Sequence, residues 1–268
     1  MVVVKTTLGD FYKEAIMNLT NKLLITSAAI LLTSNAIAND ITGTFATPQE
    51  GKFLSDTRLG YERTKFKGDF IQEGYYAMET LEYGVTDKFS ISAGIANMFD
   101  TQGYLNNDHN FAYELGAKYT TKNDRWTYQL AGEYLTYEAN EFGIYSHDTY
   151  TKQFGAQVKI GYDLDNGWSP YAVYGFNSEI DKADRELTQT IVLGTHRYDG
   201  ENSLDVAVRY DFSCDQKDND EWWLDVEYDR YLKDNVTIGV YGSYYLDGKH
   251  DDKINYDYDA GVRLKVLF

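Results

Sequence analysis

Apolar and polar residues alternate along most of the chain. Every second residue is apolar, and the residues between are charged, polar or small, in the segments 111–120, 154–164, 203–212, 223–229 and 259–268. This period of two is typical of a β-strand with one apolar and one polar face. Segments 89–98, 126–137 and 236–246 follow the same pattern, and segments 59–65, 75–85, 168–176 and 188–198 follow it less strictly. The pattern therefore predicts an all-β protein of twelve strands.

The predicted connections are alternately short and long. Short polar turns are expected at 86–88, 122–124, 165–167, 199–200 and 233–235, and the longer polar stretches QGYLNNDHN, ANEFGIYSHDTYT, NSEIDKADREL, SCDQKDND and LDGKHDD lie between them. Short turns at one end and long loops at the other are typical of a transmembrane β-barrel. We therefore predict a single antiparallel barrel with short periplasmic turns, longer extracellular loops and both chain ends on the periplasmic side.

A soluble β-sandwich is the competing fold, because its strands alternate too. In this chain, however, the apolar face is large and aromatic, and charges oppose it in strand after strand. Aromatic residues also gather near the predicted strand ends, as an interfacial girdle requires: Tyr83, Tyr119, Trp126, Tyr162, Trp168 and Trp222. These features favour the membrane barrel.

Composition agrees with strands and excludes several functional classes. The 268 residues include 2 Pro, 25 Tyr and 16% aromatic residues, and the net charge is −17. This acidic balance argues against a nucleic-acid partner, because phosphate binding needs an excess of Lys and Arg. The single cysteine, Cys214, excludes an intramolecular disulfide and a Cys-rich zinc site. No cofactor is expected.

The N-terminal region has the pattern of a secretory signal. Met17 begins a stretch with Lys22 in its short first part, an apolar core over 23–32 and Ala-Ile-Ala at 36–38. We interpret residues 1–38 as the signal region, with the true start at Met17 and cleavage after Ala38. Residues 39–268 would form the barrel. No apolar run of about 18 residues follows, which excludes a helical membrane protein.

The predicted inward face carries charges of both signs. The candidate pore-lining residues are Glu114, Lys118, Glu133, Lys159, Asp205, Arg209, Asp225, Glu227, Asp257, Asp259, Arg263 and Lys265. Over the whole predicted inward face, carboxylates outnumber bases, so the lumen is expected to be acidic to mixed and to attract cations. Twelve strands lie between small filled barrels and wide porins, which predicts a narrow or plugged lumen. Residues 40–56 are too short for a plug domain but long enough to fold inward.

Two local patterns suggest cation binding. With a tight turn at Asn123, Glu114 and Glu133 would lie nearly opposite each other, where two carboxylates could hold a cation or share a proton. Asp–His pairs occur at 108–109, 147–148 and 250–252 in predicted loops. We interpret these pairs as solvated loop residues and predict no metal site.

The chain resembles known outer-membrane barrels at two places. Phe268 resembles the C-terminal aromatic that the barrel-assembly machinery reads as a membrane-insertion signal. The stretch LEYGVTDKFSISAGI, from Leu81 to Ile95, is similar to a strand–turn–strand of the outer-membrane transporters of the phenol-degradation meta-pathway family. The strand number also resembles the oligogalacturonate-specific porins. Those line their lumen with basic residues, so the acidic face here argues against that substrate.

Catalysis finds little support in these residues. Outer-membrane phospholipases have a His and a Ser two positions apart on one strand face, and none of His109, His147, His196 and His250 has Ser at +2. We therefore predict a non-enzymatic outer-membrane porin or substrate-specific passive channel for small hydrophilic or aromatic solutes. Its partners would be lipid, lipopolysaccharide, the assembly machinery and the solute, in an unknown oligomeric state. The alternative is a closed structural or adhesive barrel, filled by paired charges, whose extracellular loops bind a partner.

Overall fold

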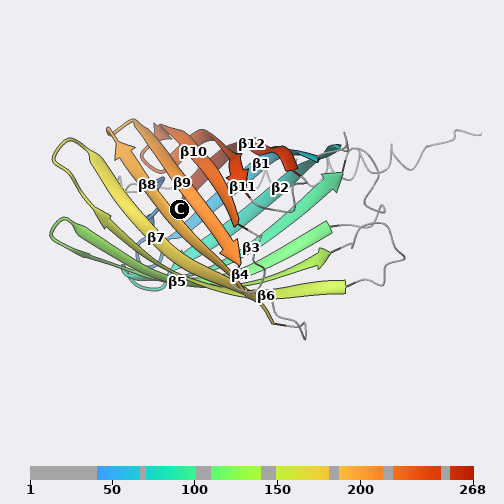
Figure 1. The fold of residues 1–268 in the computed structure, drawn as a ribbon. Coiled ribbons are helices and arrows are strands. Elements are labelled where there is room, and N and C mark those ends of the chain that lie inside the picture. Colours follow the sequence, from blue (N-terminus) through green and yellow to red (C-terminus); the bar gives the residue numbers. More distant parts are fainter. Residues whose placement is uncertain are drawn as a thin grey trace, which may run out of the picture.

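The computed structural model describes residues 41–66, 71–100, 110–139, 149–180, 187–213, 220–248 and 254–268. These residues form a closed barrel of antiparallel strands (Figure 1). The strands are β1 (Phe53–Phe66), β2 (Ile71–Gly84), β3 (Phe89–Asp100), β4 (Asn110–Asn123), β5 (Trp126–Ala139), β6 (Thr149–Tyr162), β7 (Trp168–Glu179), β8 (Leu187–Tyr198), β9 (Asn202–Ser213), β10 (Asp220–Lys233), β11 (Val236–Gly248) and β12 (Ile254–Leu267). The prediction of a twelve-stranded all-β barrel is confirmed.

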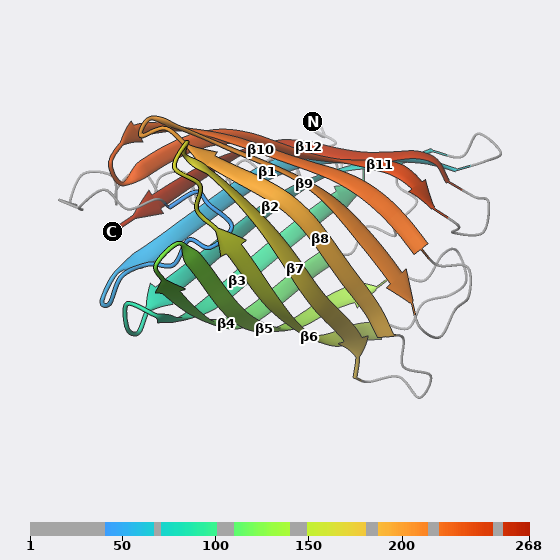
Figure 2. The same ribbon diagram turned by 60° about the vertical axis from the view of Figure 1, so that its left-hand side comes forward.

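Each strand pairs with its neighbours in sequence, and the first strand pairs with the last. The β1–β12 ladder runs from Leu54 opposite Leu267 to Phe66 opposite Ile254. Two further backbone hydrogen bonds join Phe53 and Phe268, with N···O distances of 2.8 and 2.9 Å. Their rings stack with centroids 5.7 Å apart. Because the ladder closes on itself, none of the twelve described strands has an unpaired edge (Figure 2).

Short connections lie together at one end of the barrel, which we call the turn end. They join β2 to β3, β4 to β5, β6 to β7, β8 to β9 and β10 to β11, each within two residues of the place that the sequence predicts. Gly167 and Gly200 have φ angles of +81° and +96°, a region that glycine adopts without strain. In the β8–β9 turn, the Asp199 carboxylate accepts hydrogen bonds from the backbone N–H groups of Glu201 and Asn202. We call the opposite end the loop end.

The outer surface of the barrel is apolar. Large apolar side chains at alternate strand positions are exposed, among them Ile91, Leu115, Leu130, Val158, Leu193, Val240 and Val262. Each is about 40–60% exposed, as a lipid-facing residue would be in the absence of lipid. The residues between them point into the barrel. The alternation predicted from the sequence therefore corresponds to the outer and inner faces. Among the described residues, no helix is long and apolar enough to span a membrane.

The hydrophobic alternation of β1 is weak because part of its outer face is polar. Its outward positions include Ser55 and Thr57 instead of large apolar residues. Both hydroxyls donate hydrogen bonds to the outward carboxylate of Glu79 on β2, and the Ser55 bond is 2.6 Å long. Polar side chains on both faces remove the hydrophobic alternation from which a strand is recognised. The signal region 1–38 lies outside the described residues and stays a prediction.

Candidate functional site in the barrel lumen

The barrel encloses a cavity of about 1060 Å³. All twelve strands and the segment before β1 contribute to its wall. A second cavity of about 270 Å³ adjoins it beside β5, β6, β7 and β8. Gln157, Lys159 and Tyr171 line both, so the two are parts of one polar interior space.

Most of the predicted pore-lining residues are gathered around this cavity. Those that line it are Glu114, Lys118, Glu133, Lys159, Asp205, Arg209, Asp225, Glu227, Asp259, Arg263 and Lys265. Asp257 is not among the lining residues; it lies on β12 opposite Thr64, closer to the loop end than Asp259. Nine Asp or Glu and six Lys or Arg line the cavity altogether. The sequence therefore identified the inward face of the barrel.

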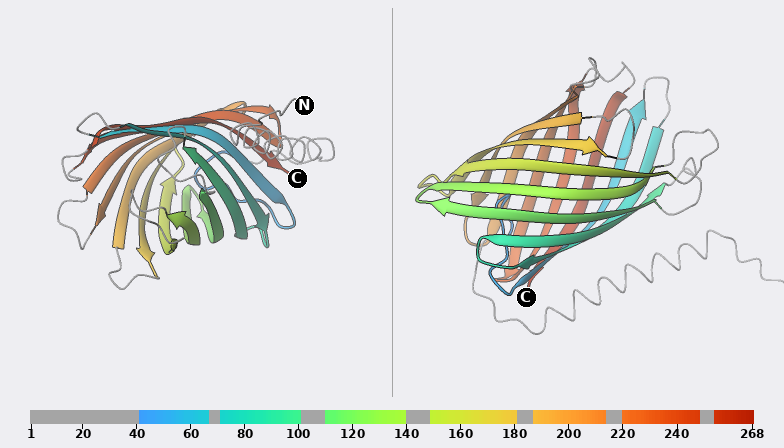
Figure 3. Two further views of the ribbon diagram at one scale, coloured as in Figure 1. Left: turned by 90° about the vertical axis from the view of Figure 1, so that its right-hand side faces the viewer. Right: turned by 90° about the horizontal axis from the view of Figure 1, so that it is seen from below.

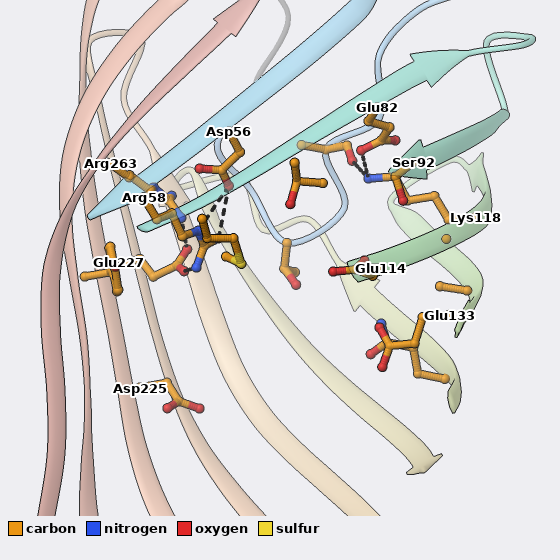
Figure 4. Close-up of a pocket in the computed structure, with 18 of the residues that line it drawn as sticks. Asp56, Arg58, Glu82, Ser92, Glu114, Lys118, Glu133, Asp225, Glu227 and Arg263 are labelled. Atoms are coloured by element: carbon orange, nitrogen blue, oxygen red, sulfur yellow. Dashed lines mark hydrogen bonds and ion pairs between the residues drawn. The ribbon is translucent and has the colours of Figure 1, made fainter. Parts of the chain in front are cut away.

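An ion network joins β1, β10 and β12 on one side of the lumen (Figure 4). Arg263 binds Glu227 at 2.6 Å and forms a two-pronged ion pair with Asp229. Arg58 binds Asp56 at 3.0 Å and reaches Glu227 at 3.5 Å. Bidentate geometry of this kind is the strong form of a carboxylate–guanidinium contact. These charges compensate one another and stiffen this wall.

Glycine makes room for the most buried of these pairs. Asp229 is fully buried, and the side chain of Arg263 is 1% exposed. Gly239 lies opposite Asp229 on β11, and a Cβ atom there would overlap the Asp229 carboxylate and come 2.5 Å from the Tyr228 carbonyl oxygen. The pair therefore depends on a residue without a side chain.

A second network lies on β9, β10 and β11. Arg209 binds Asp211 at 3.0 Å and Asp225 at 3.3 Å. Its guanidinium carbon lies 5.1 Å from the centre of the Trp223 ring. Asp225 also accepts a 2.6 Å hydrogen bond from the Ser243 hydroxyl. Each charge here has a partner of the opposite sign.

The segment before β1 lies inside the lumen at the turn end (Figure 3). Three inward lysines from distant parts of the wall donate hydrogen bonds to its backbone carbonyls. Lys118 binds the Ala46 oxygen at 2.5 Å, Lys159 binds that of Thr44 at 3.3 Å, and Lys265 binds that of Ile41 at 3.2 Å. The lumenal ammonium groups of β4, β6 and β12 are therefore bound to the chain's own backbone.

Aromatic packing fixes this segment further. Phe45 packs edge-on against Tyr171, with ring centroids 6.2 Å apart, and occupies the space above Gly161. Tyr171 donates a 2.6 Å hydrogen bond to Asp205, and His196 Nδ1 lies 3.6 Å from the other Asp205 oxygen. The sequence predicted only that residues 40–56 could fold inward. Three lysines at inward positions were the pattern from which a contact with the backbone of this segment could have been inferred.

Glu114 and Glu133 lie on the opposite side of the lumen from the arginines (Figure 4). With a tight turn at Asn123, the sequence placed them nearly opposite each other, but the register makes them diagonal: Glu114 pairs with Leu135, and Glu133 pairs with Gly116. The prediction was wrong by two positions, because the β4–β5 turn is centred on Asp124 and Arg125 instead of Asn123. The two carboxylates are diagonal neighbours, a spacing at which long side chains still interact.

A metal centre finds no support in the part of the chain that the structure describes, since no group of three or more His, Cys, Asp or Glu could hold an ion there. His109, His147, His250 and their aspartate neighbours, and Cys214, lie outside the described residues. The absence of a catalytic function stays a prediction.

The fold is similar to that of solved outer-membrane β-barrels. No protein-family model and no curated protein matches the sequence. Among solved structures, the chain is similar to an outer-membrane channel from Pseudomonas putida F1, with 11% identity and a TM-score of 0.65 over 84% of this chain and 98% of that one. It is similar to the NanC porin, with 12% identity and a TM-score of 0.57 over 79% and 98%.

A third similar structure is the KdgM porin in complex with disordered oligogalacturonate, with 10% identity and a TM-score of 0.51 over 79% of this chain and 99% of that one. Identities this low establish the fold alone. The predicted resemblance to outer-membrane barrel channels is confirmed at that level.

Proposed function

We propose that this chain is a passive outer-membrane channel for small hydrophilic solutes, with a preference for cations. The observation that carries the proposal is the charged cavity inside a closed barrel with an apolar outer surface. A purely structural barrel needs no interior space, and side chains fill the interior of the smallest barrels. The turn end would face the periplasm, and Phe268 would serve as the insertion signal.

The charge of the lining supports the cation preference. Nine acidic residues face six basic ones around the cavity. The three lysines among the bases already bind backbone carbonyls, which reduces their availability to an anionic solute. Low-dielectric walls focus the field of the remaining carboxylates into the lumen, which raises the local concentration of cations. The polar lining also favours hydrophilic solutes over apolar aromatic ones.

One observation favours the second candidate function, a closed structural or adhesive barrel. The segment before β1 occupies part of the lumen at the turn end (Figure 3). Such a barrel would act through its outer loops and would conduct no ions.

Planar-bilayer recording of the refolded chain from Asn39 to Phe268 separates the two candidates. Steady conductance steps with a reversal potential of cationic sign in a KCl gradient are expected. Anion selectivity would refute the proposed preference for cations, but the proposal that the chain is a channel would stand. A silent bilayer, from protein whose folding is shown by heat-modifiable migration on a gel, would refute the channel.

A further inference from the structure

We propose that solutes pass along the wall formed by β2 to β7, and that this wall selects small organic ammonium ions. The inference rests on the proposed channel function and names its substrate class. We call this surface the acceptor wall and define it by the oxygen acceptors Glu82, Glu114, Glu133 and Asn177 and by the glycines between them.

The acceptor wall differs from the rest of the lumen in its charge balance. Arg58, Arg209 and Arg263 on the other side are bound to carboxylates. Glu114 and Glu133 form no ion pair or hydrogen bond with any described residue, and Glu133 is exposed to the cavity. Two carboxylates at diagonal spacing repel each other and favour a positive charge between them.

Two buried oxygens on the same wall also lack hydrogen-bond donors. Glu82 is 8% exposed and lines the cavity; its Oε2 atom pairs with Lys118 at 2.8 Å, whereas its Oε1 atom has no partner among the described residues. Asn177 donates to Gln153 through Nδ2 and leaves its Oδ1 atom buried without a partner. A buried acceptor without a donor is costly, so these atoms favour a donor from the lumen.

The strand register places three of these acceptors, Glu82, Glu133 and Asn177, in a single row of paired residues. Glu82 lies opposite Ser92, Ser92 opposite Gly116, and Gly116 opposite Glu133. The row continues from Glu133 through Gly155 to Asn177. Acceptors on β2, β5 and β7 therefore alternate with small residues along the wall, in a row that rises from Glu82 near the turn end to Asn177 near the loop end.

Glycines keep this wall open. A Cβ atom on Gly155 would lie 2.8 Å from the Glu133 carboxylate, and one on Gly94 would lie 3.5 Å from that of Glu114. Gly155 and Gly175 also line the smaller cavity beside β5 to β8. The larger cavity thus reaches both unpaired carboxylates, and the smaller one adds space beside Glu133. On the other side of the lumen, Trp223, Tyr241 and Tyr245 project from β10 and β11.

These features define the solute. The carboxylates of this wall outnumber its ammonium groups, and Lys118 and Lys159 already donate to backbone carbonyls. Such a wall fits a molecule that carries a positive charge and several N–H or O–H groups, and it disfavours a carboxylate of the same size. A protonated amino sugar combines both properties. A neutral sugar offers the donors without the charge, and a sugar acid offers them with the opposite charge.

Liposome swelling with three solutes of similar size tests the proposal on the refolded chain from Asn39 to Phe268. We expect glucosaminium, the protonated form of glucosamine, to enter faster than glucose, and glucose faster than gluconate. In Glu114→Gln/Glu133→Gln the ratio of glucosamine to glucose entry should fall about threefold or more. The matched control Glu73→Gln/Glu79→Gln makes the same two changes on outward positions of β2 and should keep the wild-type ratio.

Chemical modification of a thiol after the protein has folded and inserted tests the acceptor wall even if the Gln variants fail to insert. In a Cys214→Ser background, Ala131→Cys places a thiol on the acceptor wall, and a positively charged methanethiosulfonate reagent should slow glucosamine entry more than glucose entry. The outward position Ala77→Cys serves as the control. Entry of none of the solutes would refute the channel itself. Entry without preference for glucosamine, or a preference that survives the Gln variants and the thiol modification, would overturn the acceptor wall and leave the channel standing.

Discussion

The pair of Arg263 and Asp229 provides a sharp test of what stabilises the barrel. Asp229 is fully buried, and all its described hydrogen bonds come from Arg263. Replacing Arg263 with Met removes the cation and keeps the bulk, so it leaves a buried carboxylate without a partner. Breaking a buried pair in this way costs about 3–5 kcal/mol of unfolding free energy. Glu227 is affected less, because it retains Arg58 at 3.5 Å.

The double variant Arg263→Met/Asp229→Asn should be more stable than Arg263→Met alone. Its amide carries no charge, so the remaining cost is that of an incompletely bonded polar group, about 1–3 kcal/mol. Arg209→Met is the matched control. Arg209 is 32% exposed, and Asp225 retains the Ser243 hydroxyl, so its loss should cost about 1 kcal/mol or less.

Equilibrium urea unfolding in phospholipid vesicles, followed by tryptophan fluorescence, measures these free energies. If Arg263→Met lowers the unfolding free energy by less than about 1 kcal/mol, the reasoning is contradicted, because leaving a buried carboxylate without a partner destabilises a protein by more than that. A double variant less stable than the single variant would contradict it as well. Equal losses for Arg263→Met and Arg209→Met would show that burial does not decide the cost.

Three further predictions follow from the contacts. Replacing Lys118 and Lys159 with Met removes two of the lysine contacts to the N-terminal segment, so single-channel conductance should rise; unchanged conductance would show that the segment does not narrow the path. Gly239→Ala should lower the unfolding free energy by about 1–3 kcal/mol in the urea assay, because its methyl group overlaps the neighbouring strand; a neutral effect would refute this. Hydrogen bonds from the N–H groups of Asn202 and then Glu201 hold the pKa of Asp199 below its usual 3.8. Asp199→Ala should therefore be less stable than wild type at pH 7, and the difference should vanish as the pH falls through the lowered pKa; a difference independent of pH would exclude this cause.

The sequence predicts the barrel well because its signal is local. Alternation between the outward Leu115 and the inward Glu114 depends only on the pleat of a strand, and each short turn carries its own polar residues. Strand β1 was located less accurately, because Ser55 and Thr57 on its outer face have a partner, Glu79, that is identified only when β1 and β2 are aligned.

The candidate site was predictable in composition but not in its pairing. Periodicity places Arg263 and Glu227 on the inner face, yet which arginine meets which carboxylate depends on strand register and side-chain reach. The diagonal relation of Glu114 and Glu133 depends on the position of one turn, because a shift of the turn by one residue changes the strand pairing by two. The contacts of Lys265 with Ile41 join residues 224 positions apart, a relation that no local pattern contains.

The segment before β1 has a mechanical consequence for the barrel. It is attached to β4, β6 and β12 through Lys118, Lys159 and Lys265, and these strands lie in different parts of the circumference. A thin cylinder of strands flattens easily under lateral pressure, because bending costs no ladder hydrogen bond. A strut fixed at three points across the interior opposes that flattening. The turn end should therefore keep a rounder cross-section than the loop end when the surrounding bilayer is compressed.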